Sequence, residues 1–431
     1  MEESKKKNGI SRRDFLKVAG TATAGLMASS LLPNSVFGAP ASAKILGTND
    51  KIRIAVLGVG GMGRGHLNNL KKLESEINLE VVAVCDVFEK RRLGAQQLAQ
   101  VPDEFAVSDY RKILDMKDVD AVLIASTDHW HAQMAIDAME SGKHVYVEKP
   151  MTRYLDEAWK MYDVAKKTGA VVQVGSQGCT DAKWHTAGKA VAEGKIGTVL
   201  TIQGSYCRNN PKGEWNYDID PEFTEDKVDW KKWLGPAENM PFSPEHYFRW
   251  RKFWPFGNGI IGDLWPHRLH PLMIATNITE FPTKVTCLGE NVMNTDEGIA
   301  HRRDVADSTM MIAQFPSGAM LYLLGSTVNE QGLPDLIRGN MATVYFGGGK
   351  VEIRPERPFT DIVEPEDIPV LGPGESHIEH VKNWINAIRT NTTPSCDIEL
   401  GIRVQTIVSM AEESYRKNKT VTFDPQTRKM S

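Results

Sequence analysis

The chain has 431 residues, longer than one typical domain, and this length allows two to three units that each bury a core of their own. Hydrophobic residues make up 41%, charged residues 25%, and the net charge is -4, as in ordinary globular proteins. A basic excess of the kind that phosphate backbones attract is missing, which argues against nucleic acid as a partner. The five scattered cysteines contain no CxxC pair, which excludes a zinc knuckle and a disulfide framework.

The first 43 residues predict an export signal. Three lysines at 5–7 and a twin arginine at 12–13 precede an uncharged, apolar or small stretch at 18–32, which is too short to span a bilayer. The small residues 41–43 resemble a cleavage site. A twin arginine in this setting resembles the Tat signal, whose pathway carries folded proteins. We therefore expect a signal peptide over residues 1–43, a periplasmic mature protein, and no membrane segment after cleavage.

A glycine-rich turn follows the first predicted strand, residues 52–57. It has the GxGxxG spacing between a strand and a helix-compatible stretch, the context in which this spacing indicates a dinucleotide site. Its first glycine allows the tight turn, the second lets backbone approach a pyrophosphate, and the third permits close packing of the helix. The predicted dinucleotide-binding residues of this turn are Gly58, Gly60, Gly61, Met62 and Gly63.

Asp86 ends a second apolar strand, residues 79–85. A carboxylate at this place accepts hydrogen bonds from a ribose 2′-hydroxyl and repels the 2′-phosphate of NADP. We therefore expect NAD as the cofactor. Arg91, on the helix that follows, has a side chain long enough to turn toward a 2′-phosphate, so NADP stays as the second alternative.

Strands and helices continue to alternate up to residue 175. Strands are predicted at 120–125, 143–147 and 170–175, with helices at 128–141 and 155–168. This alternation predicts a doubly wound parallel sheet, a Rossmann domain over residues 50–175. Ligands bind at the carboxyl ends of such strands. The side chains expected there are Ser126, Thr127, His131, Glu148 and Lys149, while His129 is expected to be exposed.

The rhythm changes after residue 175. A helix at 184–193 is followed mainly by strands, and two helices close the chain at 376–390 and 400–418. The predicted strands lie at 198–206, 283–289, 308–315, 319–326 and 342–346. Such runs predict an α+β domain with a largely antiparallel open sheet over residues 176–425. Residues 209–258 form a long insertion of low regularity, which in a compact domain is usually functional.

Three motifs together resemble the Gfo/Idh/MocA family, named after glucose-fructose oxidoreductase and inositol dehydrogenase. They are the run Ser126–His131, the tripeptide Glu148-Lys149-Pro150 and the segment Asp263–His267, and the likeness covers roughly residues 50–425. It implies that Lys149 lies near the nicotinamide and the substrate hydroxyl. It also implies that the peptide bond between Lys149 and Pro150 is cis, as is usual in the family. It further implies that His267 is the general base, alone or with Lys149, that Asp263 binds substrate, and that the open sheet joins a homodimer or homotetramer.

The third motif also has a physical interpretation. On a helix, Asp263 and His267 would be i and i+4, on one face and about 6 Å apart. The predicted substrate-binding residues nearby are Arg249, Arg251, Trp254 and His270. A metal site on Asp263, His267 and His270 is the alternative, but its spacing matches no known signature, so we expect no metal. Six tryptophans between 215 and 265 either line a saccharide pocket or form core.

These features predict an exported NAD(P)-dependent oxidoreductase that transfers a hydride between a sugar or polyol and a tightly bound nicotinamide. His270 stands where many family members have an aspartate, and the run His267–Pro271 is faintly similar to HGLGP of the family's NAD-dependent glycosidase branch. A glycosidase or lyase that works by transient C3 oxidation and elimination is therefore the first alternative. The alternative from another class is a non-catalytic nucleotide-binding sensor, which the joint presence of Lys149, Asp263 and His267 disfavours.

Overall fold

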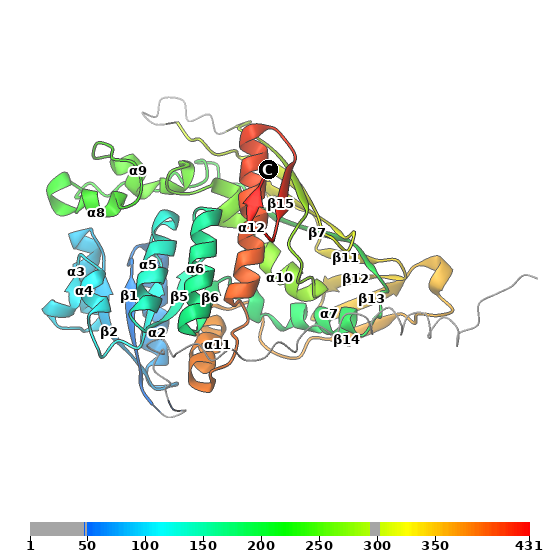
Figure 1. Cartoon of the computed structure of the whole chain (residues 1–431), viewed down its shortest axis with the longest axis horizontal. Helices are drawn as coiled ribbons and strands as arrows, with labels where there is room; N and C mark the ends of the chain where they lie inside the picture. Colours follow the sequence, from blue (N-terminus) through cyan, green and yellow to red (C-terminus); the bar gives the residue numbers. More distant parts are fainter. Residues whose placement is uncertain (1–46, 48–49, 294–301) are drawn as a thin grey trace, which may run out of the picture. The chain divides into compact units, whose positions relative to one another are not determined.

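The computed structural model describes residue 47 and residues 50–293 and 302–431 (Figure 1). The predicted signal peptide at 1–43 lies outside the described residues. Within the described part of the chain, no helix combines the length and the apolar character that crossing a membrane requires.

The first half forms the predicted Rossmann domain. Six parallel strands run in the order β3-β2-β1-β4-β5-β6, the doubly wound order of dinucleotide-binding folds. Leu57 pairs with Cys85 on one side and with Ile124 on the other, so the carboxyl ends of three strands meet at one edge. The strands are β1 Ile52–Leu57, β2 Leu79–Cys85, β3 Ala106–Val107, β4 Ala121–Ile124, β5 His144–Glu148 and β6 Val172–Gly175. Only β3, of two residues, has no predicted counterpart.

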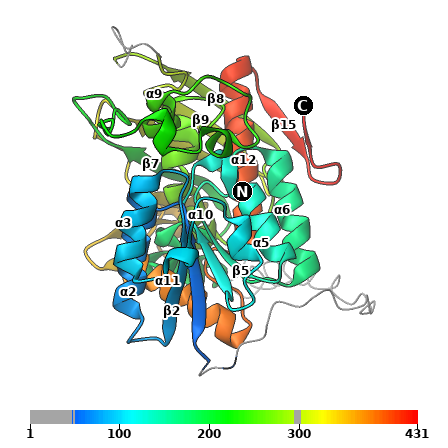
Figure 2. The same cartoon turned by 90° about the vertical axis from the view of Figure 1, so that its left-hand side faces the viewer.

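Helices from both ends of the chain cover this sheet (Figure 2). One face carries α2 Gly61–Leu73, α3 Glu89–Ala99 and the late helix α11 His377–Thr390. The other face carries α4 Arg111–Leu114, α5 Asp128–Glu140, α6 Leu155–Thr168 and the last helix, α12 Ile398–Lys417. On the α11 side, the rings of Tyr146 and Trp384 pack edge to face at 5.6 Å, so the C-terminal helices complete the N-terminal core.

The helix α6 shows how local sequence sets the boundaries. Its first turn contains Glu157, whose carboxylate accepts the backbone N–H of Tyr154 at 3.1 Å and so satisfies one of the donors that a helix start leaves free. Two lysines in its last turn complement the negative end of the helix dipole. Gly169, with φ of 68°, ends the helix in the left-handed conformation that glycine adopts without strain.

The second half forms the predicted α+β domain. Its ten-stranded sheet has the order β14-β13-β12-β11-β7-β10-β9-β8-β15-β16, in which only the β7–β10 pair is parallel. The strands β11, β13, β14, β15 and β16 were not predicted, and β16 lies beyond the predicted end of the domain at residue 425. The strands are β7 Val199–Cys207, β8 Lys284–Glu290, β9 Ser308–Gln314, β10 Met320–Ser326, β11 Leu336–Gly339, β12 Ala342–Gly347, β13 Lys350–Pro355, β14 Glu366–Pro369, β15 Val421–Asp424 and β16 Lys429–Met430.

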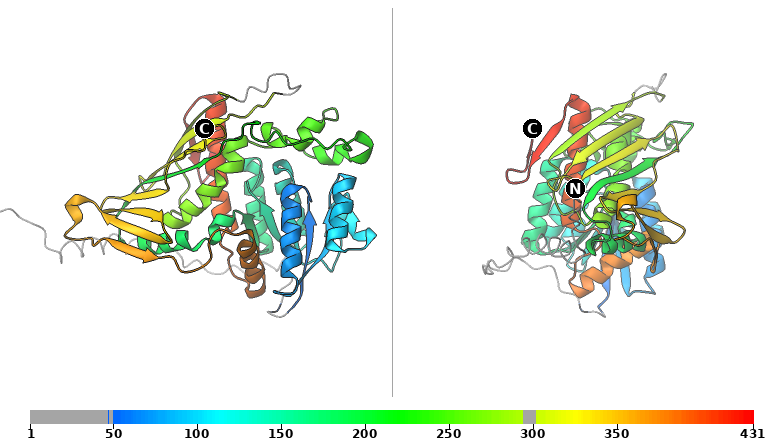
Figure 3. Two further views of the ribbon diagram at one scale, coloured as in Figure 1. Left: turned by 180° about the vertical axis from the view of Figure 1, so that it is seen from behind. Right: turned by 90° about the vertical axis from the view of Figure 1, so that its right-hand side faces the viewer.

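The two faces of this sheet differ. One face packs against α7 Ala182–Ala192, α10 Pro266–Thr276 and α12, and α12 lies between the two sheets (Figure 3). The other face exposes apolar side chains at alternate positions, as expected for a sheet with one face on the core. The larger ones are Leu200, Leu288, Met310, Ile312, Met320 and Tyr345.

The insertion 209–258 has more structure than the sequence predicted. It contains α8 Trp230–Leu234 and α9 Pro244–Phe248, which lie along the carboxyl edge of the parallel sheet (Figure 1). Phe88 pairs with Val228 in an antiparallel bridge, and a separate hydrophobic cluster joins Phe88 to the insertion. A second contact joins Gly235 of the insertion to Trp130 of α5. It requires glycine, because a Cβ at position 235 would lie 2.0 Å from the Trp130 ring. The insertion therefore packs on the cofactor side of the Rossmann domain.

A buried ion pair joins the two halves. Arg153, after β5, donates to Glu412 of α12 through both Nη atoms, at 2.6 and 2.8 Å, and the Arg153 side chain is 0% exposed. Glu412→Ala would leave this guanidinium buried without its partner, so we expect the free energy of unfolding in urea to fall by about 3 to 5 kcal/mol. Asp156→Asn, which breaks the exposed pair with Lys160, is the control and should cost little. Equal stability of the two variants would contradict a role for the buried pair in joining the halves.

Candidate active site

A cavity of about 870 Å³ opens at the carboxyl edge of the parallel sheet, between the glycine-rich turn and the insertion. Every predicted cofactor-binding residue except Gly63 lines it. Gly63 acts in packing, since a Cβ there would lie 1.9 Å from the backbone oxygen of Gly58. The lining residues of the predicted set are Gly58, Gly60, Gly61, Met62, Asp86, Arg91, Ser126, Thr127, His131, Glu148 and Lys149.

The glycine-rich turn fits a dinucleotide pyrophosphate. Gly58 has φ of 82°, and a Cβ there would lie 2.8 Å from the backbone oxygen of Ala125. A Cβ on Gly61 would meet nothing within 4 Å, so the backbone faces open space where α2 begins. The first turn of α2 contains no acidic residue, and no side chain caps it. Its free N–H groups and the positive end of the helix dipole are therefore available to an anion.

Asp86 is held in place beside this turn. Its Oδ2 accepts the backbone N–H of Val59 at 3.0 Å, and its Oδ1 accepts the backbone N–H of Phe88 at 2.9 Å. The side chain is buried, yet it lines the cavity, so its remaining acceptor capacity faces the ligand. This arrangement suits ribose hydroxyls, and together with the glycine-rich turn it fits NAD.

Lys149 lies where the cavity meets the second domain. Its Nζ donates to the carboxylate of Asp263 at 2.7 Å and to the backbone oxygen of the same residue at 2.8 Å. The other donors to that carboxylate are the Nε of Arg251, at 2.9 Å, and the indole of Trp215, at 3.0 Å. The peptide bond between Lys149 and Pro150 is cis, as the family resemblance implied.

The carboxylate of Asp263 is therefore fully engaged. Burial raises its pKa, but the positive charges of Arg251 and Lys149 outweigh burial and hold the pKa well below its usual range. Neither Asp263 nor His267 lines the cavity itself, whereas Lys149 does. Asp263 thus positions Lys149 and Arg251, and the substrate contact that the resemblance implied for it stays a prediction.

His267 is close to this group, but it does not share a regular helix face with Asp263 as predicted. Asp263 lies in a π-helical turn, Ile260–Leu264, and the α-helix begins only at Pro266, so the two residues do not share a regular helix face. The imidazole of His267 stacks on the Tyr206 ring at 5.1 Å, and its Nδ1 has no hydrogen-bond partner among the described residues. Burial, followed by the charge of Lys149, lowers its pKa to about 3, so the ring is neutral at pH 7.

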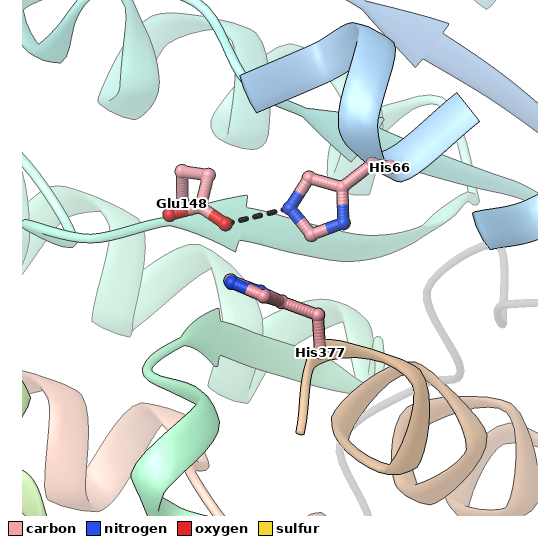
Figure 4. Close-up of side chains that lie close together, drawn as sticks. All are labelled: His66, Glu148 and His377. Carbon is pink, nitrogen blue, oxygen red and sulfur yellow. Dashed lines mark hydrogen bonds and ion pairs between the residues drawn. The ribbon is translucent and has the colours of Figure 1, made fainter. Parts of the chain in front are cut away.

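Glu148, the residue before Lys149, lies beside two histidines, His66 and His377 (Figure 4). The Nε2 of His66, from α2, donates to Glu148 Oε1 at 2.7 Å, and His377 of α11 faces the same carboxylate. Burial opposes ionisation, but the His66 hydrogen bond and the charges of His66, Lys149 and His377 together outweigh it and hold the pKa of Glu148 at about 2. Ligand atoms of the three side chains lie within 4.8 Å of one another, close enough to hold a metal ion. The hydrogen bond to Glu148 engages His66 Nε2 directly.

Two histidines of α5 connect neighbouring elements. His131 Nδ1 lies 2.8 Å from the backbone oxygen of Pro150, and its Nε2 lies 3.3 Å from that of Ser126, so the ring joins the ends of β4 and β5. The prediction that His129 is exposed is wrong. His129 is 2% exposed, with Nε2 3.0 Å from the backbone oxygen of Trp233, because the insertion covers it.

Of the four predicted substrate-binding residues, the structure brings only Arg251 to the cavity. Arg249 donates to the backbone of Tyr217 and to Glu245 within the insertion. Trp254 packs against Tyr415, and the guanidinium of Arg416 lies 5.0 Å from its ring centre. His270 is buried on α10, with Nδ1 2.9 Å from the oxygen of Pro266.

The tryptophans of residues 215–265 are mostly core. Trp215, Trp233, Trp250 and Trp265 are buried, although Trp233 and Trp250 also line the cavity. The guanidinium of Arg251 lies 4.1 Å from the ring centre of Trp250, where the two form a cation–π contact. The core interpretation therefore holds for most of the six, and one indole supports a charged residue of the cavity wall.

Asp128 is a cavity residue that lies in the run Ser126–His131 but was given no role of its own by the sequence. It is the first residue of α5, is 2% exposed and lines the cavity, and no hydrogen bond or ion pair links its side chain to any residue that the structure describes. Burial raises its pKa to about 8, with Arg251 and Lys149 opposing the rise and Asp263 adding to it.

Solved structures with this fold include sugar-acting dehydrogenases. Levoglucosan dehydrogenase, in a complex with NADH and L-sorbose, aligns with a TM-score of 0.67 and 21% identity over 86% of this chain and 99% of that chain. The WlbA dehydrogenase from Bordetella pertussis, in a complex with NADH and UDP-GlcNAcA, aligns with a TM-score of 0.63 and 18% identity over 87% of this chain and 99% of that chain. At these identities the likeness establishes the fold alone.

Curated relatives match a shorter part of the chain. A glycosyl hydrolase family 109 protein from Shewanella baltica is 36% identical over 177 residues, which is 37% of this chain and 38% of the relative. An alpha-N-acetylgalactosaminidase from Shewanella oneidensis is 36% identical over the same length. The chain thus spans about 38% of the length of these relatives.

Family-level comparison covers nearly all of the described chain. Residues 52–176 match the NAD-binding Rossmann fold of an oxidoreductase family, and residues 181–431 match the C-terminal alpha/beta domain of the same family. With the glycine-rich turn, Asp86 and Lys149 arranged around one cavity, these matches lead to one conclusion. The chain belongs to the Gfo/Idh/MocA family of NAD-binding oxidoreductases.

Proposed function

We propose that this protein transfers a hydride between a carbohydrate C–OH group and NAD. The observation that carries the proposal is the position of Lys149, whose ammonium lines the cofactor cavity while Asp263 and Arg251 fix it from the second domain. Support for a sugar as substrate comes from the complexes of the structural neighbours, which contain L-sorbose and UDP-GlcNAcA.

The chain's own residues supply proton handling and orientation, and bound NAD supplies the hydride acceptor. The ammonium of Lys149 stabilises negative charge on the hydroxyl oxygen as its proton leaves. The family resemblance assigns the uptake of that proton to the neutral imidazole of His267, which lies behind the cavity wall and whose Nδ1 has no partner among the described residues. Arg251, held by Asp263 and Trp250, orients the sugar through its remaining N–H groups.

Loss of the Lys149 ammonium or of the His267 imidazole should reduce turnover strongly and should reduce the affinity for the cofactor only a little. We expect Lys149→Ala and His267→Ala each to lower kcat by roughly 10²-fold or more, with the Kd for NADH nearly unchanged. The measurements are single-turnover reduction of bound NAD by a sugar found in a screen of mono- and disaccharides, and fluorescence titration with NADH. Lys90→Ala is the control, because Lys90 lines the same cavity but forms ion pairs with Asp220 and Glu222. Full activity of either variant would remove that residue from the proton-handling set.

The pH profile should reflect Asp128 and not a histidine. His267, with a pKa of about 3, stays neutral from pH 5 upward, so kcat/KM should show no step near pH 6.5. Asp128, with a pKa of about 8, is neutral below this pH and ionises above it, which adds a negative charge beside Lys149, Arg251 and Asp263. We expect kcat/KM to fall above about pH 8 in the native enzyme and to stay level in Asp128→Asn. An equal fall in both proteins would assign it to another group.

A glycosidase or lyase reaction is the second candidate. Two observations favour it. The curated relatives have glycosidase names, and the run His267–Pro271 is faintly similar to HGLGP of the family's glycosidase branch. In this reaction the C3 hydroxyl is oxidised with its hydride passing to NAD, the acidified C2–H is lost, and the aglycone leaves from C1 by elimination. In a glycosidase, water then adds at C1 and a proton returns to C2. The hydride finally returns from NADH to C3. The two candidates differ in product, because only the second releases an aglycone without net NADH.

We further propose that the protein is exported after folding and retains its cofactor. The twin arginine at 12–13 supports export, and NAD is expected to be scarce outside the cytoplasm. Retention over hours goes with a Kd near or below about 1 nM. We expect protein from a periplasmic fraction to carry about one nicotinamide per chain through gel filtration, identified by mass after denaturation. Arg12→Lys with Arg13→Lys should keep the protein in the cytoplasm. An empty protein that is active only with added, rapidly exchanging NAD would contradict retention.

A further inference from the structure

Arg91 is a cation at the cofactor cavity without an acidic partner. Its Nη1 donates to the hydroxyl of Tyr247 at 3.2 Å, and its guanidinium lies 5.0 and 5.2 Å from the ring centres of Tyr247 and Phe248. No carboxylate lies within ion-pair distance of Arg91 among the residues that the structure describes. Two aromatic rings of α9 therefore hold a side chain whose charge no ion pair neutralises among the described residues.

Tyr247 connects this cation to Asp86. The phenol is 4% exposed, lines the cavity, and has its oxygen 3.4 Å from Asp86 Oδ1. Burial, followed by the charge of Asp86, raises the pKa of Tyr247 well above its usual value, so the hydroxyl keeps its proton. It can then accept from Arg91 and donate toward Asp86. The result is a line of guanidinium, phenol and carboxylate across one end of the cavity.

We propose that Tyr247 is a specificity-determining residue for the cofactor, which excludes NADP by holding Arg91 and occupying the space beside Asp86. A 2′-phosphate needs a cation that offsets its charge, and Asp86 alone repels it. While Tyr247 accepts from Arg91 and the two rings fix the guanidinium, that cation is not free to turn. The hydroxyls of a ribose need only the carboxylate.

This assignment places part of the selectivity outside the Rossmann motif. Tyr247 and Asp86 are 161 positions apart, and the insertion brings them together through α9 and the Phe88–Val228 bridge. The inference rests on NAD binding and not on the reaction, so it can be tested whichever substrate the enzyme uses.

The alternative is that Tyr247 only packs in the aromatic cluster with Phe88, Phe223 and Trp233. Tyr247→Phe separates the two roles, because it keeps the ring and removes only the hydroxyl that accepts from Arg91. Tyr110→Phe is the matched control, since Tyr110 lines the same cavity but donates its hydroxyl to Asp137.

The experiment is a competition between the two cofactors. Each protein is equilibrated with equimolar NADH and NADPH, and the bound nucleotides are quantified by mass after denaturation. We expect Asp86→Ser to narrow the preference for NADH about 10-fold, and adding Tyr247→Phe to narrow it about 10-fold further. Adding Arg91→Ala to the Asp86→Ser, Tyr247→Phe double variant should return the NADH:NADPH ratio to that of Asp86→Ser alone, because the freed cation is then gone. Tyr110→Phe should leave the ratio as in the native protein.

Two outcomes would overturn the proposal. If Tyr247→Phe leaves the ratio unchanged in both the native and the Asp86→Ser background, Tyr247 acts in packing alone. If the Arg91→Ala addition does not restore the preference for NADH, Arg91 is not the cation that Tyr247 restrains. Circular dichroism and the unfolding midpoint of each variant show whether a changed ratio comes from a folded protein.

Discussion

The site depends on one buried carboxylate. Asp263 gathers Lys149 from the Rossmann domain and Arg251 and Trp215 from the insertion, so one side chain sets the position of groups from two parts of the sequence. Buried charges are tolerated only when they are paired and hydrogen-bonded. Each of these groups therefore needs the others in place. The cavity wall beside Lys149 exists only when the two halves of the chain are packed together.

Environment gives similar groups different charge states around this carboxylate. Asp263 stays ionised because two cations contact it, whereas Asp128, buried without a partner among the described residues, has a pKa of about 8. His267 is neutral because it is buried close to an ammonium. Groups whose pKa values are pushed apart in this way can take distinct acid and base roles at one pH. The proton-handling capacity of the site thus comes from the charged partners that each buried group has, more than from residue type.

The sequence predicted what local periodicity encodes. The glycine-rich turn, Asp86 and the strand ends at Ser126 and Lys149 follow directly from strand–turn–helix patterns, and all of them line the cavity. Contacts across long sequence distances were out of reach. Nothing in the local pattern indicates that His66 bonds to Glu148 or that Trp215 bonds to Asp263. Arg249 and Trp254 were predicted at the site because their residue types suit sugars, but an irregular insertion gives no periodic signal for where a side chain points. His270 was predicted there because it stands where many family members have an aspartate, but on α10 it is buried with Nδ1 near the oxygen of Pro266.

The C-terminal helices have a consequence for how this protein is made. Trp384 of α11 packs on Tyr146 in the middle of the Rossmann core, and Glu412 of α12 pairs with Arg153 just after the Glu148-Lys149-Pro150 segment. A ribosome that has finished the Rossmann sequence has not yet made these helices, so the nascent domain still exposes the apolar surface that they cover. The two halves therefore cannot fold one after the other as independent domains. Completion of the cofactor domain has to wait until nearly the whole polypeptide has been released.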